Sequence, residues 1–155
     1  MSAKTLGGLI EIAIEREEAS YAFYLGLKDK VADKDVKEAM EFLATEELKH
    51  KEFLERYRDG RYEASALQMA HPVDYKIAEH FTAPDPDKDM DTKDVYLVAA
   101  HRELLAHNFY KALADLHPDG EVKEILEKMA SQELKHKEKV EYLYANTAFP
   151  QTAGG

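Results

Sequence analysis

A glutamate and a histidine stand three residues apart at two places in the sequence, each time inside the string ELKHKE. The first pair is Glu47 and His50, and the second is Glu133 and His136. Positions i and i+3 lie on one face of an α-helix, so each pair can present a carboxylate and an imidazole in the same direction. Both groups are ordinary ligands of divalent metal ions. The two strings therefore predict two related sets of metal ligands.

The two strings belong to a longer internal repeat. A shift of 86 residues, which carries position 47 to position 133, also superposes REEASYAFYLGLKD at 16–29 on RELLAHNFYKALAD at 102–115. Under the same shift Glu17 corresponds to Glu103. Two copies of one supersecondary unit thus account for nearly the whole chain.

Each copy has the pattern of a helical hairpin. The chain is rich in Ala, Glu, Lys and Leu, which favour helix over strand, and its Asp, Thr and Gly residues stand where helices begin and end. The expected helices run from Thr5 to about Val31, from Asp33 to a stop at Gly60, from Asp91 or Thr92 to a turn at 117–120, and from that turn to about Asn146.

Residues 61–91 separate the two copies and are long enough for a crossover connection that would let the hairpins lie side by side. A short helix is expected within this crossover, from Asp74 to His80. The predicted organisation is one four-helix domain over residues 1–148 and a disordered tail over residues 149–155.

Helices in bundles bury positions that are alternately three and four residues apart. On each expected helix this spacing selects apolar residues with acidic or imidazole groups at the centre, and it extends to Tyr57, Val122 and Leu143 near the helix ends. Buried carboxylates lose hydration and repel one another, so a cation is needed among them. Two divalent ions would neutralise four glutamates. The predicted metal ligands are Glu17, Glu47, His50, Glu103, Glu133 and His136.

The sequence resembles the ferritin-like superfamily, and within it the rubrerythrin-like proteins, through REEASYAFY, EELKH, RELLAHNFY and QELKH. In di-iron carboxylate bundles one Glu comes from each of two helices and a Glu-x-x-His motif from each of the other two. The resemblance implies an all-α, ferritin-like four-helix bundle of two repeated hairpins joined by a long crossover. It also implies a di-iron centre, with manganese or a mixed metal pair left open.

The chain departs from full-length rubrerythrins in two respects. Those proteins carry a rubredoxin-type iron site made by cysteines, and this sequence has no cysteine. They also place a further glutamate one turn beyond the ligand of the third helix, where this chain has Ala106. The six ligands here are nearer to the symmetric pattern of bacterioferritin-like centres.

The resemblance implies a non-haem di-iron oxidoreductase of rubrerythrin type that reduces hydrogen peroxide or dioxygen. Electrons would come from an external donor protein, because the chain encodes no cysteine-ligated donor. The alternative is a ferroxidase that oxidises Fe(II) for iron storage or detoxification. A homodimer is expected because rubrerythrin-like bundles usually associate.

Two tyrosines and one further histidine lie near the predicted ligands. Tyr24 and Tyr110 come seven residues after Glu17 and Glu103, on the same helix face. They are candidates for a hydrogen bond to a ligand carboxylate or for one-electron transfer, although core packing is favoured over a redox role. His107 is either a conditional seventh ligand or, as favoured here, a partly exposed helix residue.

The remaining histidines and the lysines of ELKHKE are expected away from the site. Surface or loop positions are predicted for His71, His80, His101 and His117. The solvated helix face opposite the ligands is predicted for Lys49, Lys51, Lys135 and Lys137.

Composition restricts the protein class. The absence of cysteine excludes disulfides, iron–sulfur clusters and thiol nucleophiles. A net charge of −10 argues against nucleic acids and anionic membrane surfaces as partners. Glu11 and Glu15 interrupt the apolar stretch near the N-terminus, which argues against a signal peptide or a membrane span. A soluble, cytoplasmic protein is expected.

Overall fold

The computed structural model describes residues 6–60, 72, 74–81 and 91–148. Within these residues the chain is helical and has no strand. It divides into two compact units, Met1–Ala66 and Leu67–Gly155. The helices are α1 (Leu6–Asp29), α2 (Lys34–Arg58), α3 (Ile77–His80), α4 (Thr92–Asp115) and α5 (Glu121–Ala148).

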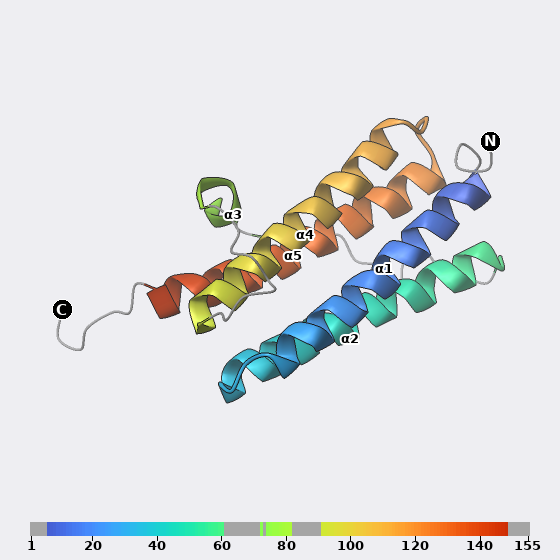
Figure 1. Ribbon diagram of the computed structural model, residues 1–155. Helices are drawn as coiled ribbons and strands as arrows, with labels where there is room; N and C mark the ends of the chain where they lie inside the picture. Colours follow the sequence, from blue (N-terminus) through green and yellow to red (C-terminus); the bar gives the residue numbers. More distant parts are fainter. Residues whose placement is uncertain (1–5, 61–71, 73, 82–90, 149–155) are drawn as a thin grey trace. The chain divides into compact units, whose positions relative to one another are not determined.

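The first unit is the hairpin of α1 and α2, which pack against each other in antiparallel directions (Figure 1). Asp33 caps α2, because its Oδ1 accepts hydrogen bonds from the backbone N–H groups of Asp35, at 2.8 Å, and Val36, at 3.2 Å. At the other end of α2, Gly60 has a φ of 75° and its N–H donates to the carbonyl of Tyr57 at 3.0 Å. Glycine adopts a positive φ more easily than other residues, which suits Gly60 to end the helix. The predicted start of the helix at Asp33 and its predicted stop at Gly60 are both confirmed.

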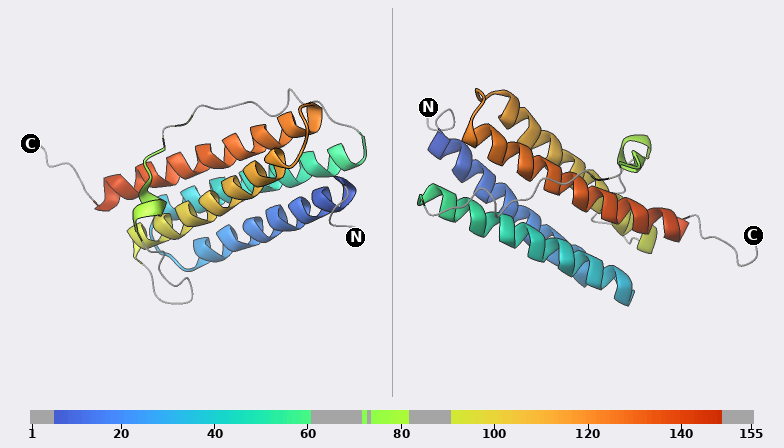
Figure 2. Two further views of the ribbon diagram at one scale, coloured as in Figure 1. Left: turned by 90° about the horizontal axis from the view of Figure 1, so that it is seen from above. Right: turned by 180° about the vertical axis from the view of Figure 1, so that it is seen from behind.

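The second unit contains the hairpin of α4 and α5 (Figures 1 and 2). Asp91 caps α4 through a hydrogen bond that its Oδ1 accepts from the N–H of Asp94 at 3.1 Å. The turn between the two helices falls at residues 116–120, as expected from HPDG. Helix α5 continues to Ala148, slightly beyond the expected end at Asn146.

The short helix of the crossover is shorter than predicted. It begins at Ile77 and not at Asp74, because Lys76 has a left-handed backbone with a φ of 57°. Asp74 Oδ1 accepts a hydrogen bond from the N–H of Lys76 at 3.0 Å and so closes a local turn ahead of the helix. Helix α3 then packs against α4 (Figure 2).

The predicted seam positions are buried along the middle of each long helix. On α1, for example, Ile10, Ala13, Glu17, Ser20, Tyr24 and Leu27 are all buried. The seam is less complete toward the helix ends, where Tyr57, Val122 and Leu143 are only half-buried. Ala106, in the middle of α4, is also half-buried. The alternating spacing therefore identifies the buried face correctly, but it overestimates how far burial extends.

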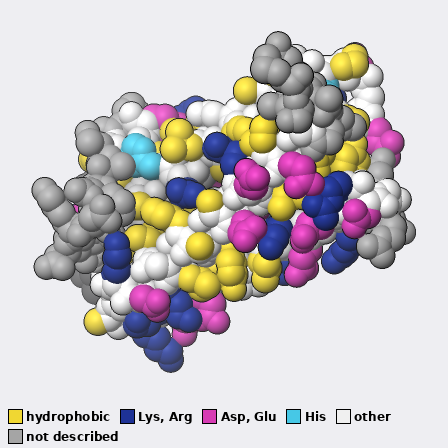
Figure 3. Space-filling model, turned by 45° about the vertical axis from the view of Figure 1, so that its right-hand side comes forward, with side chains coloured by type: hydrophobic (Ala, Val, Ile, Leu, Met, Phe, Trp, Pro, Cys, Tyr) yellow, Lys and Arg dark blue, Asp and Glu magenta, His cyan; other side chains and the backbone are white. Residues whose placement is uncertain are grey.

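Charged side chains of both signs lie on the outside of the helices, and Figure 3 shows them interspersed with hydrophobic side chains on the face that it draws. Ion pairs join α1 to α2: Lys28 lies 3.3 Å from Glu41, Arg58 lies 2.8 Å from Glu11, and Lys51 lies 3.7 Å from Glu18. Solvent screens such exposed pairs, so packing of the apolar seams contributes more to the hairpin than they do. None of the described helices combines the length and the apolar character that a membrane span requires.

Some expectations fall outside the described residues. These are the Thr5 cap, His71, the side chain of His80, the part of the crossover at 61–71 and 82–90, and the tail at 149–155.

Candidate metal centre

The first unit brings Glu17, Glu47 and His50 together. Glu17 comes from α1, and the other two come from one face of α2, where they are three residues apart. His50 Nδ1 lies 3.5 Å from Glu17 Oε1 and 3.8 Å from Glu47 Oε2. One donor atom of each residue lies within 4.8 Å of the others. All three side chains are buried.

The second unit repeats this arrangement with Glu103 on α4 and with Glu133 and His136 on α5. His136 Nδ1 lies 3.6 Å from Glu103 Oε2 and 3.9 Å from Glu133 Oε2. The three donor atoms again lie within 4.8 Å of one another, and all three residues are buried. The internal repeat of the sequence is therefore also a repeat of local geometry.

Without a metal ion, the buried carboxyl group of Glu103 is difficult to ionise. Burial, followed by the charge of Glu133 and a hydrogen bond to it, raises the pKa of Glu103 to about 8, although His136 opposes the shift. A carboxyl group in this environment keeps its proton at neutral pH unless a cation replaces it. The second unit thus favours an added positive charge beside Glu103.

The donor atoms also suit a metal ion in number, type and spacing. Divalent transition-metal ions lie about 2.1 Å from nitrogen and oxygen ligands, so two atoms sharing an ion are separated by at most about 4.2 Å. The separations between histidine nitrogen and carboxylate oxygen are 3.5–3.9 Å in the two units. Carboxylate and imidazole donors together suit iron, manganese or zinc. The residues present therefore fit a metal ion in each unit.

Comparison with protein families places this geometry in a known context. A family model described as Rubrerythrin matches residues 2–79 and 94–151, which include all six Glu and His residues of the two groups. The chain belongs to the rubrerythrin family. No curated protein and no solved structure matches the chain.

For a member of the rubrerythrin family, the buried Glu and His group of each unit indicates a metal-binding role. Family membership and the long helices of each unit also confirm the predicted all-α, ferritin-like fold class.

The two tyrosines expected near the ligands are fully buried, at 0% exposure for Tyr24 and 1% for Tyr110. Each forms an edge-on contact with the preceding phenylalanine: the ring centroids are 5.8 Å apart for Phe23 and Tyr24 and 5.2 Å apart for Phe109 and Tyr110. These contacts agree with a packing role, and a redox role for either tyrosine stays a prediction.

Three histidines outside the ligand groups bind backbone carbonyl oxygens. His107 is half-buried, and its Nδ1 lies 2.7 Å from the carbonyl oxygen of Ala130 on α5. His117 Nδ1 lies 2.6 Å from the carbonyl oxygen of Leu113, and His101 Nε2 lies 2.6 Å from that of Phe81. A carbonyl can only accept, so the ring nitrogen donates in each case. His107 is thus the partly exposed helix residue expected of it, bound to the helix that carries Glu133 and His136.

The prediction for the lysines of ELKHKE is wrong at one position. Lys49 and Lys135 are well exposed, with 68% and 57% of their side chains accessible, and Lys51 is 25% accessible. Lys137 is completely buried. Its ammonium group contacts Asp74, Glu79 and Glu141, and the first two belong to the crossover. Helical periodicity could not identify these contacts, because the residues that cover Lys137 lie about 60 positions earlier in the chain.

Proposed function

We propose that the protein is a non-haem di-iron oxidoreductase that reduces hydrogen peroxide or dioxygen with electrons from an external donor protein. The observation that carries this proposal is the repeated group of two glutamates and one histidine, buried among apolar residues in both hairpins of a rubrerythrin-family chain. In this proposal the two groups act together, and each histidine binds one of two iron ions.

The six side chains would hold the metals as in di-iron carboxylate bundles, with one Glu from each of two helices and a Glu-x-x-His motif from each of the other two. An iron pair supplies reversible one-electron redox chemistry at each ion. The protein's part is to provide hard, anionic oxygen donors that favour ferric iron. Its buried helix faces also limit the access of water.

Reduction of hydrogen peroxide requires two electrons and two protons and yields two molecules of water. The electrons must come from outside the chain, because the sequence contains no cysteine for a second iron site. The raised pKa of Glu103, about 8, belongs to the metal-free protein, and as an iron ligand Glu103 would be ionised.

A ferroxidase, with Fe(II) as substrate, is the second candidate. Two features of the chain favour it: the absence of cysteine, and Ala106 in place of the further glutamate of rubrerythrins. The first feature removes the built-in electron donor, and the second brings the ligand set closer to bacterioferritin-like centres. Storage or detoxification of iron would then replace peroxide reduction as the outcome of the same redox chemistry.

Rapid mixing separates the two candidates. Protein reconstituted with Fe(II) without oxygen is mixed with hydrogen peroxide or with dioxygen, and iron oxidation is followed by absorbance. A much faster reaction with peroxide, and turnover when a reduced donor is added, supports the oxidoreductase. Accumulation of ferric iron beyond two ions per chain supports the ferroxidase. A chain that binds no iron contradicts both.

The identity of the metal pair and the assembly state belong to the same proposal. We propose iron, with manganese as the alternative, and a homodimer. Anomalous scattering from a crystal would count the metals and identify the element, and light scattering would give the mass of the assembly in solution.

A further inference from the structure

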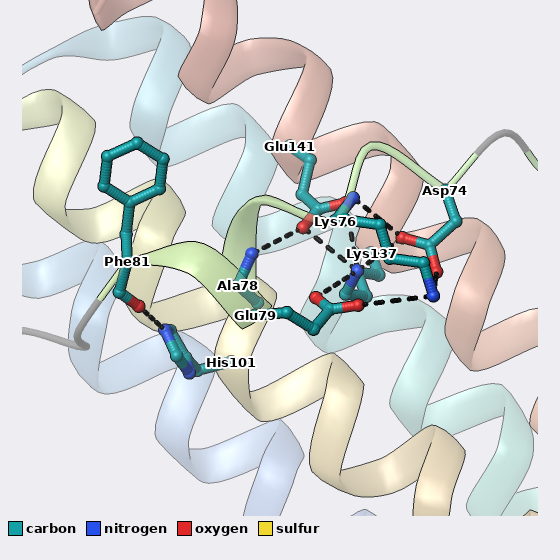
Figure 4. A network of polar contacts seen from close by, with 8 residues as sticks. All are labelled: Asp74, Lys76, Ala78, Glu79, Phe81, His101, Lys137 and Glu141. Carbon is teal, nitrogen blue, oxygen red and sulfur yellow. Dashed lines mark hydrogen bonds and ion pairs between the residues drawn. The ribbon is translucent and has the colours of Figure 1, made fainter.

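A lysine ammonium group is completely buried in the second unit, beside the helix face that carries two proposed metal ligands. Lys137 Nζ lies 2.6 Å from Asp74 Oδ1, 2.9 Å from Glu79 Oε1 and 3.0 Å from Glu141 Oε2 (Figure 4). Glu141 is one turn further along α5 and is also completely buried. A buried ammonium group is stable only when such partners surround it, so these contacts must be retained in the folded protein.

The crossover residues at 74–81 are attached to the second unit by further contacts. The N–H of Ala78 donates to Glu141 Oε2 at 2.8 Å. His101 of α4 donates to the carbonyl oxygen of Phe81, and the ring of Phe81 lies 5.7 Å from that of Tyr144 on α5. Figure 4 shows the contacts of Lys137 gathered beside the start of α3, and the contact between His101 and Phe81 at its other end. Residues 74–81 are therefore fastened to both helices of the hairpin.

The internal repeat provides a comparison within the chain. Under the shift of 86 residues, Lys137 and Glu141 correspond to Lys51 and Glu55 of α2. Lys51 is 25% accessible, and its partner is Glu18 of α1 at 3.7 Å. Glu55 is half-buried. The same pair of residues is thus partly open to solvent in the first unit and closed over by residues 74–81 in the second.

The three carboxylates around Lys137 resemble a cation site in composition, since Asp74, Glu79 and Glu141 each offer an oxygen within 4.8 Å of the others. The ammonium group already contacts all three of them. The network therefore has its own cation, and its structural role is to join the crossover to α5.

Lys137 is close to the proposed ligands along the helix, because it follows His136 directly and comes one turn after Glu133. Any rotation of α5 that breaks the contacts of Lys137 must also turn these two side chains. We propose that Lys137 is a positioning residue: by binding Asp74 and Glu79 it docks residues 74–81 on α5, and it thereby fixes the orientation in which α5 presents Glu133 and His136. This inference rests on the proposed function, in which those two residues bind a metal ion.

The test compares Lys137→Met, which keeps the length of the side chain and removes its charge, with Lys51→Met at the repeat-related position. Docking is measured by hydrogen exchange at the amide of Ala78, which donates to Glu141 in the docked state. Metal binding is measured by anaerobic titration with Co(II), whose visible spectrum reports ligand number and geometry. We expect Lys137→Met to speed exchange at Ala78 at least about tenfold and to weaken binding of one Co(II) ion about tenfold or more, with an altered spectrum. Lys51→Met should change neither measurement.

A second variant covers the case in which Lys137→Met does not fold, as judged by circular dichroism. Asp74→Asn combined with Glu79→Gln leaves α5 unchanged and removes the two crossover charges. It should produce the same changes to a smaller extent. Unchanged exchange at Ala78 would overturn the docking role. Faster exchange with unchanged Co(II) binding would overturn the positioning role alone. Wild-type protein that binds no Co(II) would instead contradict the proposed function and remove the positioning role with it, while exchange at Ala78 would still decide the docking role.

Discussion

In the metal-free protein, burial and a neighbouring carboxylate disfavour the ionised form of Glu103. Its pKa is raised to about 8 by burial and then by Glu133. Glu133→Gln keeps the shape of the side chain but removes the neighbouring charge. In the metal-free protein this change should lower the pKa of Glu103. It should also raise the free energy of unfolding at pH 8 by about 1 kcal/mol, which corresponds to a shift of roughly one pKa unit.

Urea denaturation in the presence of a chelator measures this effect. The control is Glu124→Gln, which removes one exposed carboxylate from the same helix and should leave stability nearly unchanged. A Glu133→Gln variant that is no more stable than wild type at pH 8 would show that the two carboxylates do not interact as described.

In the metal-bound protein, removing a ligand side chain should weaken metal binding. Glu47 and Glu133 occupy repeat-related positions beside His50 and His136, so Glu47→Ala and Glu133→Ala should have the same effect. Each variant should lose at least one of two metal ions and most of its oxidase activity. Metal analysis of the purified variants by mass spectrometry decides the question, and full occupancy in either one would refute its assignment as a ligand.

The residues that could be predicted from the sequence are those whose environment is set by their own helix and its partner. Spacing identifies Glu17 and Glu103, and both are buried beside a histidine. Lys137 could not be predicted, because its burial depends on Asp74 and Glu79 in a distant segment. Its sequence neighbours are the same as those of Lys51, which remains partly accessible.

At the level of the helices, the ends were predictable where a side chain caps the backbone. Asp33 and Asp91 both accept hydrogen bonds from the first turn of the helix that follows, and Gly60 provides the positive φ that ends α2. The start of α3 was not predictable in this way, because Lys76 adopts a left-handed conformation that lysine rarely favours. The local turn at Asp74 and the contacts of Lys137 with that residue favour this conformation.

The cap of α2 yields a prediction that does not depend on any metal ion. Asp33→Ala removes the oxygen that accepts from two backbone N–H groups, so it should lower the free energy of unfolding by about 1 kcal/mol. Lys34→Ala is the matched control, since Lys34 is adjacent, 87% accessible and not a capping residue. Thermal or urea denaturation compares the two. Equal stability of Asp33→Ala and Lys34→Ala would contradict the capping role.

On the scale of the whole molecule, the two units repeat one arrangement of buried residues. Each pairs a helix carrying one buried glutamate with a helix carrying a buried Glu–His pair, so each has carboxylates that are costly to bury as anions. The internal repeat of the sequence predicts this equivalence directly. What distinguishes the units is the crossover segment, which is docked on the second one.

The stability of the whole protein should therefore depend on pH in opposite ways with and without metal. In the metal-free protein the folded state raises the pKa of Glu103 from an ordinary value of 4.5 to about 8, so it binds a proton more tightly than the unfolded state does. The stability associated with this proton is complete below about pH 4.5 and is lost as the pH rises toward about 8. Bound metal requires ionised carboxylates and competes with protons, so its stabilising effect should increase over the same range.

Thermal melts between pH 5 and about 7.5, with Mn(II) as a redox-stable ion or with a chelator, compare the two states. The difference in melting temperature between them should widen toward the higher pH. A difference that is equal at both ends of the range, or no stabilisation by Mn(II) at all, would contradict a metal site built from these buried glutamates.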